Sequence, residues 1–147
     1  HVINEYLAKK IAGDGEGATA LFEVNIVGAE TKEQAVLLSK AIACSNLTKT
    51  AIAGHDANWG RIICAMGYSG AQFDPEKVDL FFESEAGKIQ IAENGVALDF
   101  SEEKATEILS QPVVIATADV KMGDAKATAG GCDLTHGYIE INADYRS

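Results

Sequence analysis

The sequence has no long apolar run and little basic charge. None of its apolar stretches approaches the roughly 18 consecutive residues that a membrane-spanning helix requires. Twelve lysines and arginines stand against 22 aspartates and glutamates, which gives a net charge of −10. Because affinity for nucleic acids depends on clustered basic side chains, this balance argues against a nucleic-acid partner. We expect a soluble, cytoplasmic protein that binds neither nucleic acid nor membrane.

Cysteine and histidine are also scarce. The three cysteines, Cys44, Cys64 and Cys132, lie far apart without CxxC spacing, and the three histidines show no HExxH or HxH pattern. Structural and catalytic zinc sites use such clustered ligands, so we expect no metal site and small, buried thiols. No GxSxG motif is present either. Local spacing therefore supports no catalytic nucleophile within this chain.

What remains is the composition of an ordinary globular chain. The 147 residues are 47% hydrophobic and 23% charged, with no linker, repeat or low-complexity tract. We predict a single domain over residues 1–147. Residues 1–11 already show helical periodicity through Ile3, Leu7 and Ile11, yet neither a methionine nor a cap precedes them. We therefore expect that the chain begins inside a larger protein.

Helices and strands alternate irregularly along the sequence. Apolar periodicity predicts helices over residues 32–45 and 102–110. Thr31 can cap the first helix, and either Ser101 alone or Asp99 with Glu102 can cap the second. Short β-rich runs predict strands over residues 21–27, 47–54, 78–83, 88–92, 96–100, 113–119, 125–129 and 138–142. The fold class expected is α/β of the α+β type, a layered, mixed and mainly antiparallel sheet with helices packed on it.

The segment Asp56–Gly67 holds the single tryptophan and predicts a further helix. Trp59, Ile62, Ile63 and Met66 follow i, i+3, i+4 and i+7 spacing, which indicates one buried face. Asp56 or Asn58 can cap its start, and Asn58, Gly60 and Arg61 crowd its first turn. Spacing leaves two interpretations open, a capped core helix and a helix start that faces an anionic ligand.

Three other segments have both a structural and a functional interpretation. Glu16 lies between glycines in a tight turn after a helix, where it is either a solvated turn residue or a site residue. The turn does not follow a strand, which excludes a dinucleotide fingerprint. The small residues of 125–129 indicate close packing or a nearby ligand. Residues 142–147 directly continue an apolar strand and form either a surface terminus or the lining of a site.

Four segments together resemble one enzyme family. They are Gly13-Asp14-Gly15-Glu16-Gly17-Ala18-Thr19, Asp56-Ala57-Asn58-Trp59-Gly60-Arg61-Ile62, Cys132-Asp133-Leu134-Thr135-His136 and Ile141-Asn142-Ala143-Asp144-Tyr145-Arg146-Ser147. Their order and spacing resemble the ornithine acetyltransferase (glutamate N-acetyltransferase) family of arginine biosynthesis. The resemblance covers essentially the whole chain and identifies it as the C-terminal part of that family's β-chain.

The resemblance implies ping-pong acyl transfer by a threonine at the start of the β-chain, produced when the precursor cuts itself. That threonine is absent here, so the catalytic residues implied by the family lie outside this chain. Glu16, Asn142 and Ser147 match positions at which the family contacts substrate. Ser147 stands where many members have threonine, which keeps the hydroxyl. For Asn58 and Arg61 the resemblance assigns no individual role.

The resemblance also implies partners. They are the N-terminal α-chain and the missing start of the β-chain, in a heterotetramer, with N-acetylornithine, ornithine and glutamate as substrates and products. No cofactor is expected, although acetyl-coenzyme A is an acetyl donor for bifunctional members. Gly130-Gly131 and Gly137 depart from the residues common in the family. The alternatives are a non-catalytic amino-acid-binding or regulatory domain and a related N-terminal-nucleophile peptidase.

Overall fold

The computed structural model describes residues 21–132 and 139–141, with the backbone alone for residues 131, 132 and 139–141. No helix in these ranges is long and apolar enough to cross a membrane. In chain order the elements are β1 (Leu21–Ala29), α2 (Lys32–Cys44), α3 (Asn46–Ala53), α4 (Trp59–Gly67), the short 3₁₀ helix η1 (Pro75–Lys77), β2 (Asp79–Ser84), β3 (Gly87–Glu93), β4 (Val96–Ala97), α5 (Glu102–Leu109), β5 (Val113–Asp119), β6 (Ala125–Cys132) and β7 (Ile139–Ile141).

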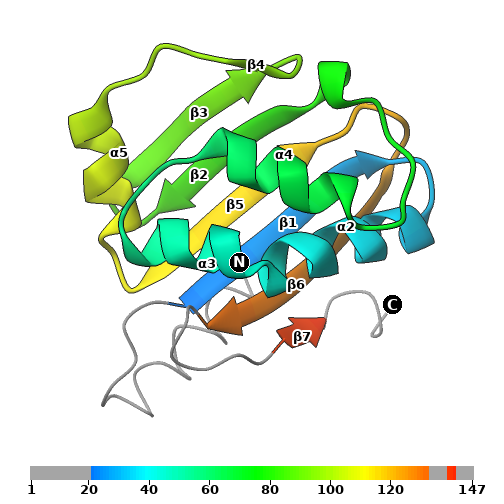
Figure 1. Ribbon diagram of the computed structural model, residues 1–147, viewed down its shortest axis with the longest axis horizontal. Helices are drawn as coiled ribbons and strands as arrows, with labels where there is room; N and C mark the ends of the chain where they lie inside the picture. The colour runs from blue at the N-terminus through cyan, green and yellow to red at the C-terminus, as the bar shows by residue number, and fades with distance from the viewer. Residues whose placement is uncertain (1–20, 133–138, 142–147) are drawn as a thin grey trace.

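The seven described strands form one sheet in the order β4-β3-β2-β5-β1-β6-β7 (Figure 1). β1 and β5 pair in parallel, and every other neighbouring pair among the described strands is antiparallel. Helices α2, α3 and α4 lie across one face of the sheet, and α5 packs against β2 and β3 (Figure 1). The predicted fold class, a mixed and mainly antiparallel sheet with helices packed on it, is therefore confirmed.

The core lies between the sheet and the helices. Phe22, Val24 and Ile26 alternate along β1 and are completely buried, as expected for the covered face of a strand. β5 supplies small and branched residues at the same levels, since Val114 pairs with Phe22 and Ala116 with Val24. The helices complete the cluster with Leu38, Ile42, Ile52, Ile62, Met66, Ile108 and Leu109.

Three helices begin at cap residues that the sequence predicts. The side-chain oxygen of each cap accepts a hydrogen bond from the backbone N–H three residues later, at 3.0 Å for Thr31, 3.1 Å for Asn58 and 3.1 Å for Ser101. Asn58 rather than Asp56 caps α4. Ser101 caps α5 through its hydroxyl. The other predicted cap, Asp99 with Glu102, is not the one that the helix uses. These helix starts follow from local chemistry alone.

The predicted strand over residues 47–54 is wrong, because this segment forms helix α3. Ser45 ends α2 and caps α3, and its hydroxyl accepts a hydrogen bond from the backbone N–H of Thr48 at 3.2 Å. The buried residues of α3 then follow helical rather than alternating spacing: Thr48, Lys49, Ala51 and Ile52. An eight-residue segment is too short for its periodicity to separate helix from strand.

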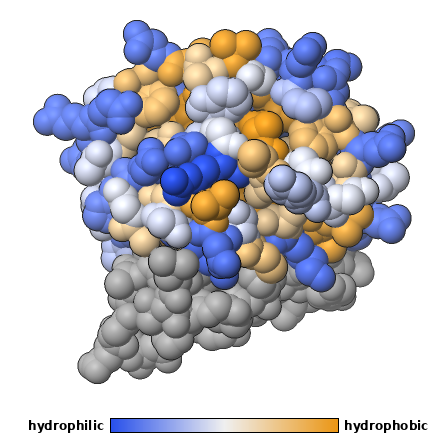
Figure 2. All heavy atoms as spheres, viewed as in Figure 1, coloured by the Kyte–Doolittle hydropathy of each residue, from blue (hydrophilic) through white to orange (hydrophobic). Residues whose placement is uncertain are grey.

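The predicted burial of the thiols is wrong for Cys44 and Cys64, which are exposed. Each lies at the outer face of a helix whose neighbouring positions, Ala43 and Ala65, supply buried contacts instead. The side chain of Cys132 lies outside the described residues. Figure 2 shows hydrophobic side chains interspersed with hydrophilic ones on this helix-covered side of the molecule.

The small residues of β6 serve close packing. α2 packs on both β1 and β6. Ala127 and Ala129, on the covered face of β6, are 3% and 0% exposed beneath it. Short side chains let the helix approach the sheet closely. Of the two interpretations of this strand, the structure therefore supports close packing.

Candidate functional site

The three predicted substrate-contacting residues, Glu16, Asn142 and Ser147, lie outside the described residues. The structure does describe the strands that follow and precede their segments in sequence: β1 begins at Leu21, and β7 ends at Ile141, directly before Asn142. Both strands pair antiparallel with β6 and so run in the same direction. At their described ends, Leu21 of β1 pairs with Cys132 and Ile141 of β7 pairs with Ala129, so the start of β1 and the end of β7 lie at different levels of β6.

The start of α4 is a closed polar network. The Oδ1 atom of Asn58 accepts a hydrogen bond from the backbone N–H of Arg61 at 3.1 Å, and the Nδ2 atom of Asn58 donates to Oδ2 of Asp56 at 3.1 Å. Asp56 therefore orients the amide that caps the helix. Both polar ends of the Asn58 side chain are occupied within this segment.

Arg61 extends this network to the neighbouring helix. Its guanidinium Nη1 donates to the backbone carbonyl of Leu47, in the first turn of α3, at 3.0 Å. The donor is charged, which strengthens the hydrogen bond to this carbonyl. Asn58 and Arg61 thus brace α3 against α4, which supports the capped-core interpretation of the segment. On the apolar side of α4, Ile62 and Met66 are 2% and 0% exposed, and Trp59 and Ile63 are partly buried against the core.

Glu23 is a buried acid that residue spacing in the sequence does not single out. It lies in β1 on the face of the sheet opposite the helices and is 0% exposed. Across the sheet it pairs with Ile115, which in turn pairs with Glu83 of β2, so the two carboxylates share one row. Burial, together with the negative charge of Glu83, raises the pKa of the Glu23 carboxyl from 4.5 to about 7. A single charged residue in an otherwise uncharged strand was the available signal.

Further polar side chains lie beside Glu23 on the face of the sheet opposite the helices. Asn25, two residues after Glu23 and on the same face, accepts a hydrogen bond at its Oδ1 from the hydroxyl of Thr128 in β6 at 2.8 Å. The strip therefore combines a carboxyl group that titrates near neutral pH with an ordered amide–hydroxyl pair. Such a carboxyl group can hold or release a proton under physiological conditions.

Two other polar clusters are structural. Lys121 Nζ lies 2.9 Å from Oδ1 of Asp79 and 2.8 Å from Oδ1 of Asn94, which ties the β5–β6 loop to β2 and to the β3–β4 turn. The hydroxyl of Ser110 lies 3.5 Å from Nδ1 of His55 but donates to the backbone carbonyl of Thr106 at 2.6 Å, so it is already committed as a donor. The described residues contain no group of three or more potential metal ligands.

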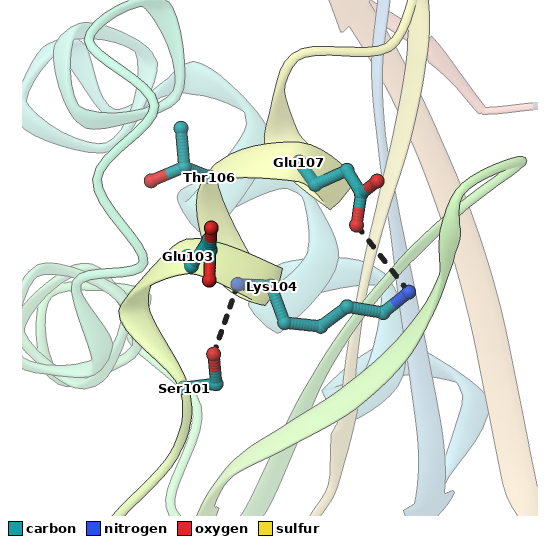
Figure 3. Close-up of a pocket in the computed structure, with 5 residues that line it drawn as sticks. All are labelled: Ser101, Glu103, Lys104, Thr106 and Glu107. Carbon is teal, nitrogen blue, oxygen red and sulfur yellow. Dashed lines mark hydrogen bonds and ion pairs between the residues drawn. The ribbon is translucent and has the colours of Figure 1, made fainter.

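A shallow pocket beside α5 is lined by one helix and its cap (Figure 3): Ser101, Glu103, Lys104, Thr106 and Glu107. Three of its side chains are engaged within the fold: Ser101, Lys104 and Glu107. Lys104 Nζ donates to the carbonyl of Ala86 at 2.9 Å and lies 3.5 Å from Oε1 of Glu107, while Ser101 caps the helix. Because its lining comes from a single element, this pocket does not bring separate chemical groups together.

Comparison with known proteins relates the whole chain to one family. The model of the ArgJ family matches residues 1–147. The chain is 55% identical over 147 residues to the arginine biosynthesis bifunctional protein ArgJ of Thermotoga neapolitana, covering all of this chain and 37% of that protein. It is 46% identical over 143 residues to the glutamate N-acetyltransferase of Methanothermobacter thermautotrophicus, covering 95% of this chain and 36% of that protein.

A solved relative has the same fold. The crystal structure of the arginine biosynthesis bifunctional protein ArgJ from Bacillus halodurans superposes with a TM-score of 0.77 and 44% sequence identity, covering 91% of this chain and 62% of that chain. The chain thus spans little more than a third of the length of the curated relatives that it matches. Because the family model covers its full length, the chain belongs to the ArgJ family.

Proposed function

We propose that this chain is part of an acetyltransferase that moves acetyl from N-acetylornithine to glutamate in arginine biosynthesis. The observation that carries the proposal is the match of the family model to the full length of the chain. Relatives at 55% and 46% identity are named arginine biosynthesis bifunctional protein and glutamate N-acetyltransferase, respectively. The likeness to a solved ArgJ structure, at 44% identity, supports the same assignment.

The proposed chemistry uses a nucleophile from the part of the enzyme that precedes this chain. The hydroxyl oxygen of an N-terminal threonine, produced by autocatalytic cleavage, attacks the acetyl carbonyl of N-acetylornithine while its α-amino group takes the proton. The amide C–N bond then breaks, and ornithine leaves with that proton. The amine of glutamate attacks the acyl-threonine ester, and a proton returns to the threonine oxygen as N-acetylglutamate forms.

Within this chain, we assign substrate contacts to Glu16, Asn142 and Ser147. The carboxylate of Glu16 suits the amino group that gives or receives acetyl, because a charge-assisted hydrogen bond would hold it. The amide of Asn142 and the hydroxyl of Ser147 can orient the polar groups of an amino-acid substrate. The described part of the chain contributes the strands next to them in sequence, β1 and β7, which both pair with β6.

The proposed partners are the α-chain and the missing start of the β-chain, in a cytoplasmic heterotetramer. The fraction of the relatives that this chain covers, 37% for the Thermotoga neapolitana protein, is consistent with such additional parts. No cofactor is required for acetyl exchange between amino acids. The Thermotoga neapolitana relative is named a bifunctional protein. If this enzyme is bifunctional as well, acetyl-coenzyme A would serve as a second acetyl donor.

The test is to produce this chain together with its missing N-terminal portion and to measure acetyl transfer from N-acetylornithine to glutamate. We expect exchange, and Glu16→Ala should reduce it strongly without preventing assembly. Glu33→Ala, at an exposed position of α2, is the matched control and should leave exchange unchanged. A folded, assembled wild-type complex that shows no exchange would contradict the proposal.

A further inference from the structure

The side chain of Gln34 joins three loops at the end of the sheet where β1 finishes. Gln34 lies in the first turn of α2 and is 7% exposed. Its Oε1 atom accepts a hydrogen bond from the backbone N–H of Glu30, between β1 and α2, at 2.6 Å. Its Nε2 atom donates to the backbone carbonyl of Gln72, in the loop after α4, and to the Sδ atom of Met122, in the loop between β5 and β6. We call these four residues the loop junction, and their segments lie together on the right-hand side of Figure 1.

The loop that carries Met122 is held by further contacts. The backbone N–H groups of Met122 and Gly123 both donate to the carbonyl of Gly28, at 2.6 Å and 2.9 Å. Lys121 has a φ of +56°, and its ammonium lies 2.9 Å from Oδ1 of Asp79. A residue other than glycine adopts this left-handed conformation at a cost, which surrounding contacts must offset. The loop therefore depends on its contacts, rather than on its own backbone preference, for its conformation.

Met122 is the member of the loop junction whose sulfur side chain reaches solvent. It is 37% exposed, whereas the other methionine of the chain, Met66, is 0% exposed in the core. Oxidation of methionine follows exposure, and a methionine that is exposed and makes no other contact is oxidised without consequence for the fold. The sulfur of Met122 differs because it accepts a hydrogen bond, at 3.5 Å, from the side chain that also holds the other two loops.

Hydrogen peroxide converts the thioether of methionine to a sulfoxide. A sulfur lone pair attacks one peroxide oxygen, the S–O bond forms as the O–O bond breaks, and the proton of the transferred hydroxyl joins the departing hydroxide as water. An oxygen on the side of Gln34 has no room between two atoms that are 3.5 Å apart. An oxygen on the solvent side leaves a sulfur with partial positive charge, which accepts poorly. In both cases an N–H of the buried Gln34 amide loses its acceptor, which destabilises the folded state.

We propose that Met122 is an oxidation site for hydrogen peroxide and that Gln34 transmits its oxidation to the loop junction. In the reduced protein, one amide ties the β5–β6 loop to α2 and to the loop after α4. In the oxidised protein this tie is weaker, so the enzyme melts at a lower temperature. Reduction of the sulfoxide restores the tie. This property goes beyond acetyl transfer and does not depend on it.

The experiment uses the complete enzyme as wild type, Met122→Leu, Gln34→Glu and the double variant. Met122→Leu keeps an apolar side chain of similar size that peroxide does not oxidise. Gln34→Glu keeps an acceptor for the backbone N–H of Glu30 and removes both N–H donors of the amide. Melting temperatures are measured before and after treatment with hydrogen peroxide, and peptide mass spectrometry follows the sulfoxide at Met122 and Met66. Methionines elsewhere in the enzyme are present in all four proteins, so differences between them isolate Met122.

Met122 should be oxidised at least about tenfold faster than Met66. Peroxide should lower the melting temperature of the wild type by at least about 2 °C more than that of Met122→Leu, and methionine sulfoxide reductase should reverse this difference. In the Gln34→Glu background, Met122→Leu should make no difference to the loss caused by peroxide.

Three results would overturn the inference. They are a Met122 that stays reduced as long as Met66, equal peroxide-induced losses in the wild type and Met122→Leu, and an effect of Met122 that is as large with Gln34→Glu as without it. If Gln34→Glu does not fold, the comparison of the wild type with Met122→Leu decides alone.

Discussion

The guanidinium of Arg61 and the carbonyl oxygen of Leu47 join helices α4 and α3 through a 3.0 Å hydrogen bond. The two residues are 14 positions apart in sequence, and one lies in the first turn of each helix. Through this contact the Asp56–Arg61 segment, which stands out in the sequence for its polar first turn, acts on the placement of α3 rather than only on its own helix.

Replacing Arg61 by methionine should destabilise the enzyme by about 1 kcal/mol, because its hydrogen bond to Leu47 is exposed to solvent. The change removes a charged donor and leaves the Leu47 carbonyl without this partner, while the aliphatic stem is retained. Thermal melting of the complete enzyme measures the effect. Lys40→Met, which removes a positive charge from an exposed position of α2, should change the melting temperature much less. Equal melting temperatures for the two variants would show that the contact with Leu47 does not contribute.

Asn58→Ala should cost about 1 kcal/mol of stability through loss of the N-cap of α4. Asn58→Asp keeps an acceptor oxygen for the backbone N–H of Arg61 and should recover the capping interaction. It also places a second carboxylate beside Asp56, so its recovery should improve in high salt. Melting temperatures at low and high ionic strength test both statements. A salt-independent loss of equal size in the two variants would contradict the capping role.

Gly28→Ala should be strongly destabilising, by more than about 1 kcal/mol. Gly28 has a φ of +69°, and an added Cβ would collide with the carboxylate of Asp119 and lie 2.9 Å from the backbone nitrogen of Lys121. Gly67→Ala is the matched control, because no atom lies within 4 Å of an added Cβ at the end of α4. Its stability should equal or exceed that of the wild type. Similar melting temperatures for the two variants would refute the steric argument.

Glu23 should make the stability of the protein depend on pH between about 4.5 and 7. In the unfolded chain the carboxyl loses its proton near pH 4.5, whereas in the folded chain its pKa is about 7. The folded state therefore binds more protons between these values, so stability is highest below the lower pKa and falls as pH rises through the upper one. The difference corresponds to roughly 3 kcal/mol at most.

Glu23→Gln removes this titration while keeping the size of the side chain. The stability of the variant relative to the wild type should therefore increase from pH 5 to pH 8, as measured by thermal melting of both proteins at each pH. Glu33→Gln, at an exposed position, should show no such trend. A constant difference between Glu23→Gln and the wild type across this range would show that Glu23 does not titrate there.

Elements whose signals are local were predicted from the sequence. Thr31, Asn58 and Ser101 cap helices where expected, because a side-chain oxygen needs only a backbone N–H three residues away. The strands β1 and β5 were predicted because their apolar, β-branched runs are strong and continuous. Helix α3 was missed because eight residues carry too little periodicity, and its helical state is supported by contacts with α2 and α4.

The predicted substrate contacts at Glu16, Asn142 and Ser147 came from the family resemblance and not from spacing. Motif identity can name such residues, but it could not indicate Glu23 or Met122. Glu23 acquires its raised pKa because β1 lies in the interior of the sheet, between β5 and β6, and in one row with Glu83. The burial of Glu23 and its position in one row with Glu83 both depend on strand pairing, and the residues next to Glu23 in the sequence do not determine either.

The sequence by itself determined the family of this protein, the caps and apolar faces of its principal helices, and the mixed character of its sheet, because each depends on residue identity and short-range spacing. Only the tertiary structure decided that Arg61 braces α3, that Cys44 and Cys64 are exposed, that Glu23 is buried, and that Gln34 contacts Met122. These properties depend on which elements pack together. Burial and electrostatic environment are set by contacts between segments that are distant along the chain.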